Sequence, residues 1–169
     1  MLQIFKTQVT GRLQAINERQ AEAIEDGARL LAQAAFTGGN IYIGGFGEME
    51  VMTIEAFRGG DQWNIPFHVL PPIDQIQTVT PQDRVILASR FSHDEEACTA
   101  ARALTAQAIP FLSLTTVREE SDELAALAEV AIDLKVKTGL IPQDDGSRIG
   151  YPASLVALYS FFLLSLDVN

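Results

Sequence analysis

The chain has 169 residues, of which 47% are hydrophobic and 20% charged, and this composition excludes an intrinsically disordered polar chain. The length is that of one domain, so we expect a single domain over residues 1–169. Asp and Glu number 22 against 12 Lys and Arg, a net charge of −10. No nucleic-acid partner is expected, because a protein that binds phosphate backbones needs a basic face. The single cysteine, Cys98, excludes an intrachain disulfide and is expected to be buried rather than nucleophilic.

The two ends of the chain predict a cytoplasmic protein. Residues 1–5 are followed by Lys6 and polar residues, a pattern that does not favour a secretory signal. Residues 155–166 are apolar on nearly all sides, which predicts a helix buried in the core or against another subunit. This segment is shorter than the roughly 20 apolar residues that span a bilayer, so we expect no membrane partner.

Helical periodicity dominates the beginning of the chain. Apolar residues recur at steps of three and four from Leu2 to Ile16, and a second series runs from Ile24 to Ala35. This second series stops before Gly38 and Gly39, which suit a helix end. We therefore expect a helical lead-in over residues 1–36, followed by an α/β core over residues 41–169.

Short apolar runs then alternate with helical segments. The expected strands lie at residues 41–43, 65–70, 84–88, 111–115 and 130–134, and the expected helices lie at residues 48–58, 93–108, 121–128 and 155–166. Residues 71–82 contain several prolines and predict a loop or a single turn. Alternating strands and helices predict a three-layer αβα sandwich around a five-stranded parallel sheet.

Ligands of such sheets bind beyond the carboxyl ends of the strands, and the first of these segments is rich in glycine. Gly45, Phe46, Gly47 and Glu48 follow the first strand and are candidate ligand-binding residues. Glu50 occupies the place of the third glycine of a dinucleotide fingerprint, so we expect no NAD and no other cofactor. The glycines indicate either a tight turn or a close approach of the backbone to a ligand.

Two further strand ends carry hydroxyl groups. Ser89, Arg90 and Ser92 precede a helix and are candidates for binding a phosphate at its N-terminus. Ser92 and Glu95 also have the spacing of a capping box, which would explain them without a ligand. The acidic residues 94–96 in the same turn would repel an anion.

Thr115 and Thr116 end a later strand, and we expect their hydroxyls to contact a ligand. His93, at the mouth of this site, is the best candidate for a general acid or base, and Glu55 is a second candidate. His68 lies in an apolar strand and is expected to be structural. No cluster of His, Cys and carboxylates has the spacing of metal ligands, so we expect no metal.

The order of these segments resembles that of the SIS, or sugar isomerase, domain. Three stretches carry the resemblance after the helical lead-in: Gly39 to Gly47, Pro81 to Ser89 with its following helix, and Ile109 to Thr115. The similarity covers residues 20–168 and is greatest to the phosphoheptose isomerases. It implies a flavodoxin-like sheet, a phosphorylated sugar as ligand, and a homodimer or homotetramer in which neighbouring subunits complete each site.

The resemblance also defines what differs from the family. Only Ser89 is in register with the family's serine-rich phosphate loop, and residues 151–169 contain no counterpart of its C-terminal histidine. Gly59 falls near the position of the family's helical glutamate. If the chain works as the family does, Arg90 would replace the phosphate contacts of the missing loop hydroxyls. His93 or Glu55 would replace the missing catalytic glutamate and histidine. We expect a sugar-phosphate-binding protein, either an aldose–ketose isomerase like the phosphoheptose isomerases or a non-catalytic sensor or regulatory protein.

Overall fold

The five expected strands form a single parallel sheet. The computed structural model describes residues 1–60 and 63–168. The strands run in the order β2-β1-β3-β4-β5 and all neighbouring pairs are parallel. Their bounds are β1 Ile41–Gly45, β2 Phe67–Val69, β3 Arg84–Phe91, β4 Phe111–Thr116 and β5 Val130–Asp133. The three central strands are almost entirely buried, which explains their continuous apolar sequences.

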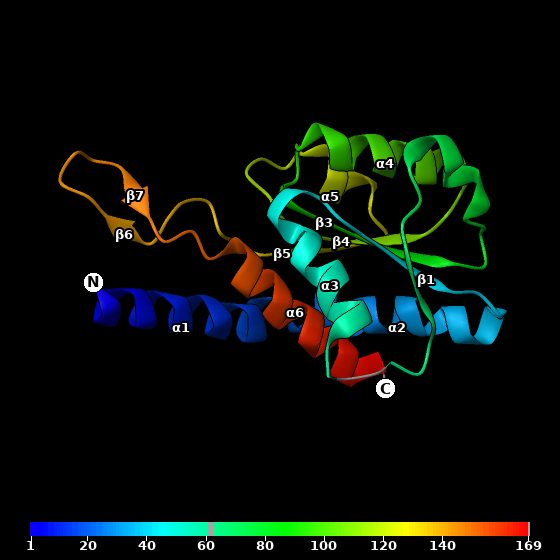
Figure 1. Cartoon of the computed structure of the whole chain (residues 1–169), viewed down its shortest axis with the longest axis horizontal. Coiled ribbons are helices and arrows are strands. Elements are labelled where there is room, and N and C mark those ends of the chain that lie inside the picture. Colours follow the sequence, from blue (N-terminus) through cyan, green and yellow to red (C-terminus); the bar gives the residue numbers. More distant parts are fainter. Residues whose placement is uncertain (61–62, 169) are drawn as a thin grey trace.

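Helices cover both faces of the sheet (Figure 1). One face carries α2, α3 and α6, with bounds Ala21–Thr37, Glu50–Arg58 and Ala153–Val168. The other face carries α4 at Glu95–Ala106, α5 at Glu123–Leu127 and the 3₁₀ helix η2 at Ile73–Thr78. The predicted three-layer αβα sandwich is therefore confirmed. The helix α2 belongs to the first layer, since Leu31 and Ala34 are fully buried in the same core as α6.

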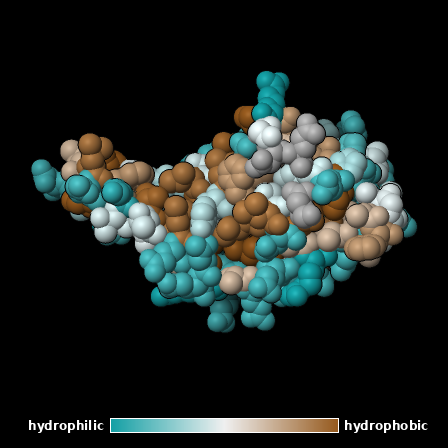
Figure 2. Space-filling model, turned by 90° about the horizontal axis from the view of Figure 1, so that it is seen from below, coloured by the Kyte–Doolittle hydropathy of each residue, from teal (hydrophilic) through white to brown (hydrophobic). Residues whose placement is uncertain are grey.

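The helix α1, Leu2–Arg19, projects beyond the sheet. A small hairpin of β6, Ile141–Pro142, and β7, Arg148–Ile149, projects at the same end of the molecule (Figure 1). The sequence did not predict this hairpin, because two-residue strands are too short to show an alternating pattern. Figure 2 shows hydrophobic side chains on this projecting end.

The apolar C-terminal helix α6 packs against α2 and α3. Phe161 is buried against Trp63 and Phe67, with ring centroids 5.2 and 6.2 Å away. The opposite side of α6 leaves Phe162 and Leu166 exposed. Within residues 1–60 and 63–168, no helix has both the length and the apolar character needed to cross a membrane.

One local expectation was wrong. Ser92 does not form a capping box with Glu95, because its side chain is buried and bonded to the segment of α5 instead, and α4 begins at Glu95 with Asp94 as its N-cap. His68 is exposed on the edge strand β2, where its Nε2 lies 3.3 Å from Oδ1 of Asn40. Residues 71–82 contain the expected turn as η2. Cys98 is buried, as expected.

Candidate functional site

The strand order reverses between the neighbouring strands β1 and β3. The chain leaves these two strands toward opposite faces of the sheet. After β1 it enters the 3₁₀ helix η1, Gly47–Met49, and then α3, whereas after β3 it enters α4 on the other face. A crevice at the carboxyl ends of the strands is the usual ligand site at such a reversal. The residues after β1, β3, β4 and β5 therefore define the candidate site.

The glycines after β1 are required by the turn itself. A Cβ atom on Gly45 would lie 2.2 Å from the carbonyl oxygen of Met49, so no side chain fits there. Gly47 has a φ of 58°, a left-handed conformation that favours glycine. The tight-turn interpretation thus accounts for both residues. The turn also places Phe46, Gly47 and Glu48 beside Arg90 in the wall of one shallow cavity of about 370 Å³.

Arg90 and Glu48 form an ion pair across this cavity. Nε and Nη2 of Arg90 donate to the two carboxylate oxygens of Glu48, and the Nε contact is 2.9 Å long. This pairing raises the pKa of Arg90, chiefly through the hydrogen bond to Glu48. Both side chains are partly exposed, at 46% for Arg90 and 31% for Glu48. The ion pair neutralises the cation at the end of β3, and a bound anion would have to compete with Glu48.

The four predicted hydroxyl groups all lie inside the protein. Ser89, Ser92, Thr115 and Thr116 have no exposed surface. The Ser89 hydroxyl donates to the carbonyl of Phe91 and shares a 3.0 Å hydrogen bond with Thr115. Their direct contact with a ligand stays a prediction. In this structure they fix the course of the loops that follow β3 and β4.

Ser92 and Thr116 join these loops to their neighbours. The Ser92 hydroxyl accepts from the amide of Ala125 at 2.8 Å, and the Thr116 hydroxyl accepts from the amide of Val136 at 3.2 Å. These bonds connect β3 with α5 and β4 with the segment after β5. Buried polar groups bonded in this way give the loops a defined position.

A stack of cationic and aromatic groups lies on the other side of Arg90. The guanidinium carbon of Arg118, after β4, lies 3.9 Å from the ring centroid of Phe91. The ring of His93 is nearly parallel to that of Phe91, with centroids 5.5 Å apart. The guanidinium carbon of Arg90 lies 5.0 Å from the ring centroid of Tyr151. Ring faces of this kind attract guanidinium groups and hold them in place.

Tyr151 connects the two arginines. Its hydroxyl donates to the carbonyl of Val136 at 2.7 Å, which fixes the ring next to Phe91. Burial raises the pKa of Tyr151, while the charges of Arg90 and Arg118 act in the opposite direction. Arg90 contacts the ring of Tyr151 directly, whereas Arg118 contacts Phe91, whose ring meets that of Tyr151 edge-on. Among the described residues, Arg118 has no carboxylate within 4.0 Å, so its charge is available to an anion.

The two catalytic candidates lie apart. Nδ1 of His93 is 3.7 Å from Oδ2 of Asp122, and His93 is about half exposed. Burial would raise the pKa of Asp122, but the amides of Arg118 and Glu119 and the nearby His93 lower it. Glu55 is directed toward Gly59, where its Oε1 would contact an added Cβ atom, at the end of α3 away from the site. The structure thus brings His93 to the site and leaves Glu55 outside it.

The acidic residues at the start of α4 differ in their partners. Glu95 is bound by Arg102, and this contact lowers its pKa. Asp94 accepts a hydrogen bond from the amide of Phe91 at 3.0 Å. Glu96 has no cation within 4.0 Å among the described residues. The negative charge therefore remains on the α4 side of the site, while the Arg118 side is cationic.

No group of three or more His, Cys, Asp or Glu residues in the described part of the chain is arranged to hold a metal ion. The site residues that sequence reasoning did not select are Phe91, Arg118, Asp122 and Tyr151. Arg118 follows the end of β4, so its position next to a strand end is a signal that could have identified it. Tyr151 has no such signal, because it reaches Phe91 only through the folding of a segment about sixty residues further along the chain.

Solved structures place the fold in a known class. The sugar isomerase domain of the RpiR transcription factor from Sphaerobacter thermophilus has a TM-score of 0.70 at 18% identity, covering 98% of this chain and 88% of that one. The phosphoheptose isomerase GmhA from Neisseria gonorrhoeae has a TM-score of 0.70 at 13% identity, covering 96% and 94%. The protein c3406 of Escherichia coli CFT073, solved in complex with a phosphosugar, has a TM-score of 0.70 at 13% identity, covering 98% and 89%. The fold is that of the sugar isomerase domains.

The sequence assigns the chain to a narrower group. Residues 1–169 match the family described as "Domain of unknown function (DUF2529)". The chain is 34% identical over 170 residues to the Bacillus subtilis (strain 168) protein described as "Uncharacterized protein YwjG", covering all of this chain and 96% of that protein. The chain belongs to the DUF2529 family.

Proposed function

We propose that this protein binds a phosphorylated sugar at the carboxyl edge of its sheet, with the phosphate between Arg90 and Arg118. The observation that carries the proposal is the pair of guanidiniums held over Tyr151 and Phe91, at the edge where ligands of this sheet topology bind. Guanidinium groups bind phosphate through two parallel hydrogen bonds, which gives them both strength and direction.

The class of ligand is supported by the proteins that share the fold. One of them was solved in complex with a phosphosugar, and two others are described as a phosphoheptose isomerase and as a sugar isomerase domain. In the SIS domain family the hydroxyls of a serine-rich loop bind the phosphate. The hydroxyls of this chain are buried and bonded internally, so Arg90 and Arg118 would bind the phosphate instead. We place the protein in the cytoplasm, in line with its single cysteine.

Binding without turnover is the form of the proposal that the geometry supports best. An aldose–ketose isomerase needs a base for the carbon-bound proton and an acid at the carbonyl oxygen. His93 lies at the site, whereas Glu55 points away from it at the far end of α3, so one chain does not assemble this pair. A sensor or regulatory protein requires only the binding site, and the RpiR transcription factor shows that the fold is used in a regulator.

Isomerase activity is the second candidate, and the contact between His93 and Asp122 favours it. The carboxylate of Asp122, 3.7 Å from Nδ1, faces the imidazole on the side of α5 and orients its ring. Turnover of sedoheptulose 7-phosphate by the purified protein, abolished in H93A and retained in H68A, would establish this activity. Lack of turnover in the wild type at concentrations that saturate binding would exclude it.

We also propose that the protein forms a homodimer or homotetramer through its projecting end. Met1, Leu2 and Ile4 at the start of the chain and Ile149 of β7 are exposed there, and Phe5 lies next to Gly150 of the hairpin segment. Apolar residues gathered on a projecting element are typical of an interface. Light scattering of the wild type and of the double variant L2E/I4E tests this interface. We expect an oligomer at micromolar concentration that dissociates in the double variant. A monomeric wild type, or an oligomer that the two substitutions do not change, would contradict the proposal.

The binding proposal is tested by thermal stabilisation with glucose 6-phosphate and sedoheptulose 7-phosphate, with glucose as the unphosphorylated control. We expect stabilisation by the phosphorylated sugars only. Loss of one charge-assisted hydrogen bond in R118Q should weaken binding about tenfold or more. R29Q removes an equal charge from an exposed position on α2 and should bind as the wild type does. If R118Q and R29Q lost the same affinity for the phosphorylated sugars, the effect would be due to net charge alone, and the proposed site would be contradicted.

A further inference from the structure

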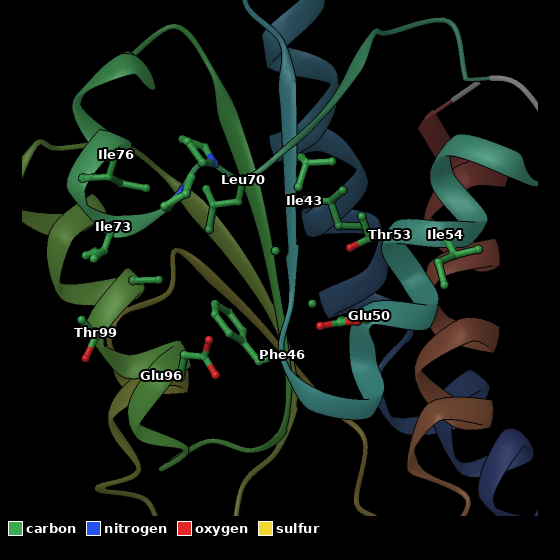
Figure 3. A pocket seen from close by; sticks show the side chains of 16 residues that line it. Ile43, Phe46, Glu50, Thr53, Ile54, Leu70, Ile73, Ile76, Glu96 and Thr99 are labelled. Atoms are coloured by element: carbon green, nitrogen blue, oxygen red, sulfur yellow. The ribbon is translucent and has the colours of Figure 1, made fainter.

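A second and larger cavity lies beside the proposed phosphate site, between α3 on one wall and η2 and α4 on the other (Figure 3). Its volume is about 590 Å³, within the range of small-molecule sites. Gly44 and Gly45 of β1 form its floor, and Phe46 and Glu96 border both this cavity and the one beside Arg90. The cavity is not used by the proposed binding of a sugar phosphate.

The cavity exists because β2 is shorter than β1. Only Ile41 to Ile43 pair with β2, and the last hydrogen bond runs from the amide of Leu70 to the carbonyl of Ile43. The chain then turns away through Pro71 and Pro72 into η2. Beyond Ile43, β1 has no strand neighbour on this side. A Cβ atom on Gly44 would meet the side chain of Leu70 at 2.8 Å, so the glycine lets Leu70 pack directly on the strand at the edge of the cavity.

The walls of the cavity are apolar and partly open to solvent. Leu70 and Ile76 line it, and Ile54 and Ile73 stand at its edge with 58% and 50% of their surfaces exposed. Several large apolar side chains around one opening favour an apolar ligand over a carbohydrate. A sugar, with hydroxyls on every side, would find few hydrogen-bond partners here.

The charges around the opening are all negative. Among the described residues that line the cavity, the ionisable ones are Glu50 at the start of α3 and Glu96 at the start of α4. In Figure 3 their carboxylates approach the cavity from opposite walls, on either side of Phe46. Within the described part of the chain neither has a cation within 4.0 Å, whereas Glu48 and Glu95 are both paired with arginines. Two unpaired carboxylates facing one opening create a site for a positive charge.

We propose that this cavity binds a small amphipathic amine, with its ammonium group between Glu50 and Glu96 and its apolar body on the floor formed by Gly44, Gly45 and Leu70. The ring of Phe46 adds an aromatic face that favours a cation. The same charges oppose an anionic ligand, so the cavity and the phosphate site select opposite charges. The proposal is independent of the sugar-phosphate proposal and goes beyond it.

Calorimetric titration with hexylamine and phenethylamine tests the proposal, with hexanol and hexanoate as probes of equal chain length. The amines should bind, hexanol should bind more weakly, and hexanoate should bind least. E50Q and E96Q should each weaken amine binding roughly two- to fivefold and leave hexanol unaffected. E22Q, an exposed substitution on α2, is the matched control and should change nothing.

A second variant separates the cavity from its charges. T53F places a ring at the cavity wall and should abolish binding of both amines and hexanol, while the circular dichroism spectrum and melting curve report whether it folds. R118Q should leave amine binding unchanged, which distinguishes this site from the phosphate site. Equal affinity for hexylamine and hexanol, unaltered binding in the double variant E50Q/E96Q, or no binding of any amine would each overturn the proposal.

Discussion

Arg90 at the end of β3 and Glu48 in η1 bind each other through two parallel hydrogen bonds, although 42 residues separate them in the chain. The pair joins the two loops that diverge from the strand reversal, at the edge where the ligand is proposed to bind. Glu48 thus occupies the face of Arg90 that a phosphate would use. Through this contact, one of the protein's many carboxylates competes directly with an anionic ligand for Arg90.

Removal of the Glu48 charge should strengthen anion binding. In E48Q the Arg90 guanidinium loses its competitor, so the affinity for inorganic phosphate and glucose 6-phosphate should rise roughly two- to tenfold. Since both side chains are partly exposed, stability should change by less than about 1 kcal/mol. E123Q, which breaks the Arg102 pair between α4 and α5, is the control. Weaker binding in E48Q would show that Glu48 contacts the ligand itself.

Substitution of Gly45 should destabilise the protein. An added Cβ atom would meet the carbonyl oxygen of Met49 at 2.2 Å, so G45A must displace the turn after β1, at a cost of about 2 kcal/mol or more. G11A in the exposed middle of α1 meets nothing within 4 Å and should stabilise by about 0.5–1 kcal/mol. Urea unfolding measures both. A G45A protein as stable as the wild type would contradict the tight-turn interpretation.

Asp83 should make stability depend on acid pH. This buried carboxylate accepts from the amides of Asn40 and Thr80, each at 2.8 Å, and from the Thr80 hydroxyl. Burial would raise its pKa, but these donors lower it below the ordinary value of an aspartate. Its contribution is therefore present above the pKa of the unfolded state and is lost as the pH falls through the lower folded value.

The corresponding variant is D83N, which should lose about 1–3 kcal/mol at pH 7 and show a flatter loss of stability between roughly pH 5 and 2. D74N at an exposed position of η2 is the control. A parallel decline of wild type and D83N with falling pH would contradict this role for Asp83.

The buried hydroxyl of Ser92 should matter for stability. S92A removes a fully buried hydroxyl and leaves the part-buried amide of Ala125 without its 2.8 Å acceptor, and should cost about 1–3 kcal/mol. S121A, on the exposed side of the same segment, should cost less than about 0.5 kcal/mol. Ligand affinity measured well below the melting temperature should be unchanged in S92A. A selective loss of affinity with normal stability would assign Ser92 to the ligand instead.

The sequence predicts the sheet well because buried parallel strands leave continuous apolar runs, as in residues 84–88 and 111–115, which lie within β3 and β4. Helix starts are predicted less well. Ser92 has the spacing of a capping residue, but its hydroxyl faces α5, and the N-cap of α4 is Asp94. Spacing along the chain identifies a residue that can cap, whereas tertiary contacts decide whether it does.

The candidate site could be predicted only in part for the same reason. Arg90 is recognisable as a cation at a strand end, but its partner Glu48 and the ring of Tyr151 come from segments that meet it only in the folded chain. Glu55 illustrates the reverse case. It lies on the expected helix, yet the direction of its side chain toward Gly59 removes it from the site.

A crystal structure of the protein grown with sedoheptulose 7-phosphate tests the central proposal most directly. We expect phosphate oxygens at hydrogen-bond distance, about 2.7–2.9 Å, from the guanidiniums of both Arg90 and Arg118, with Glu48 displaced from Arg90. A phosphate bound at another place, or a site that stays empty at saturating ligand with the Arg90–Glu48 pair intact, would contradict it.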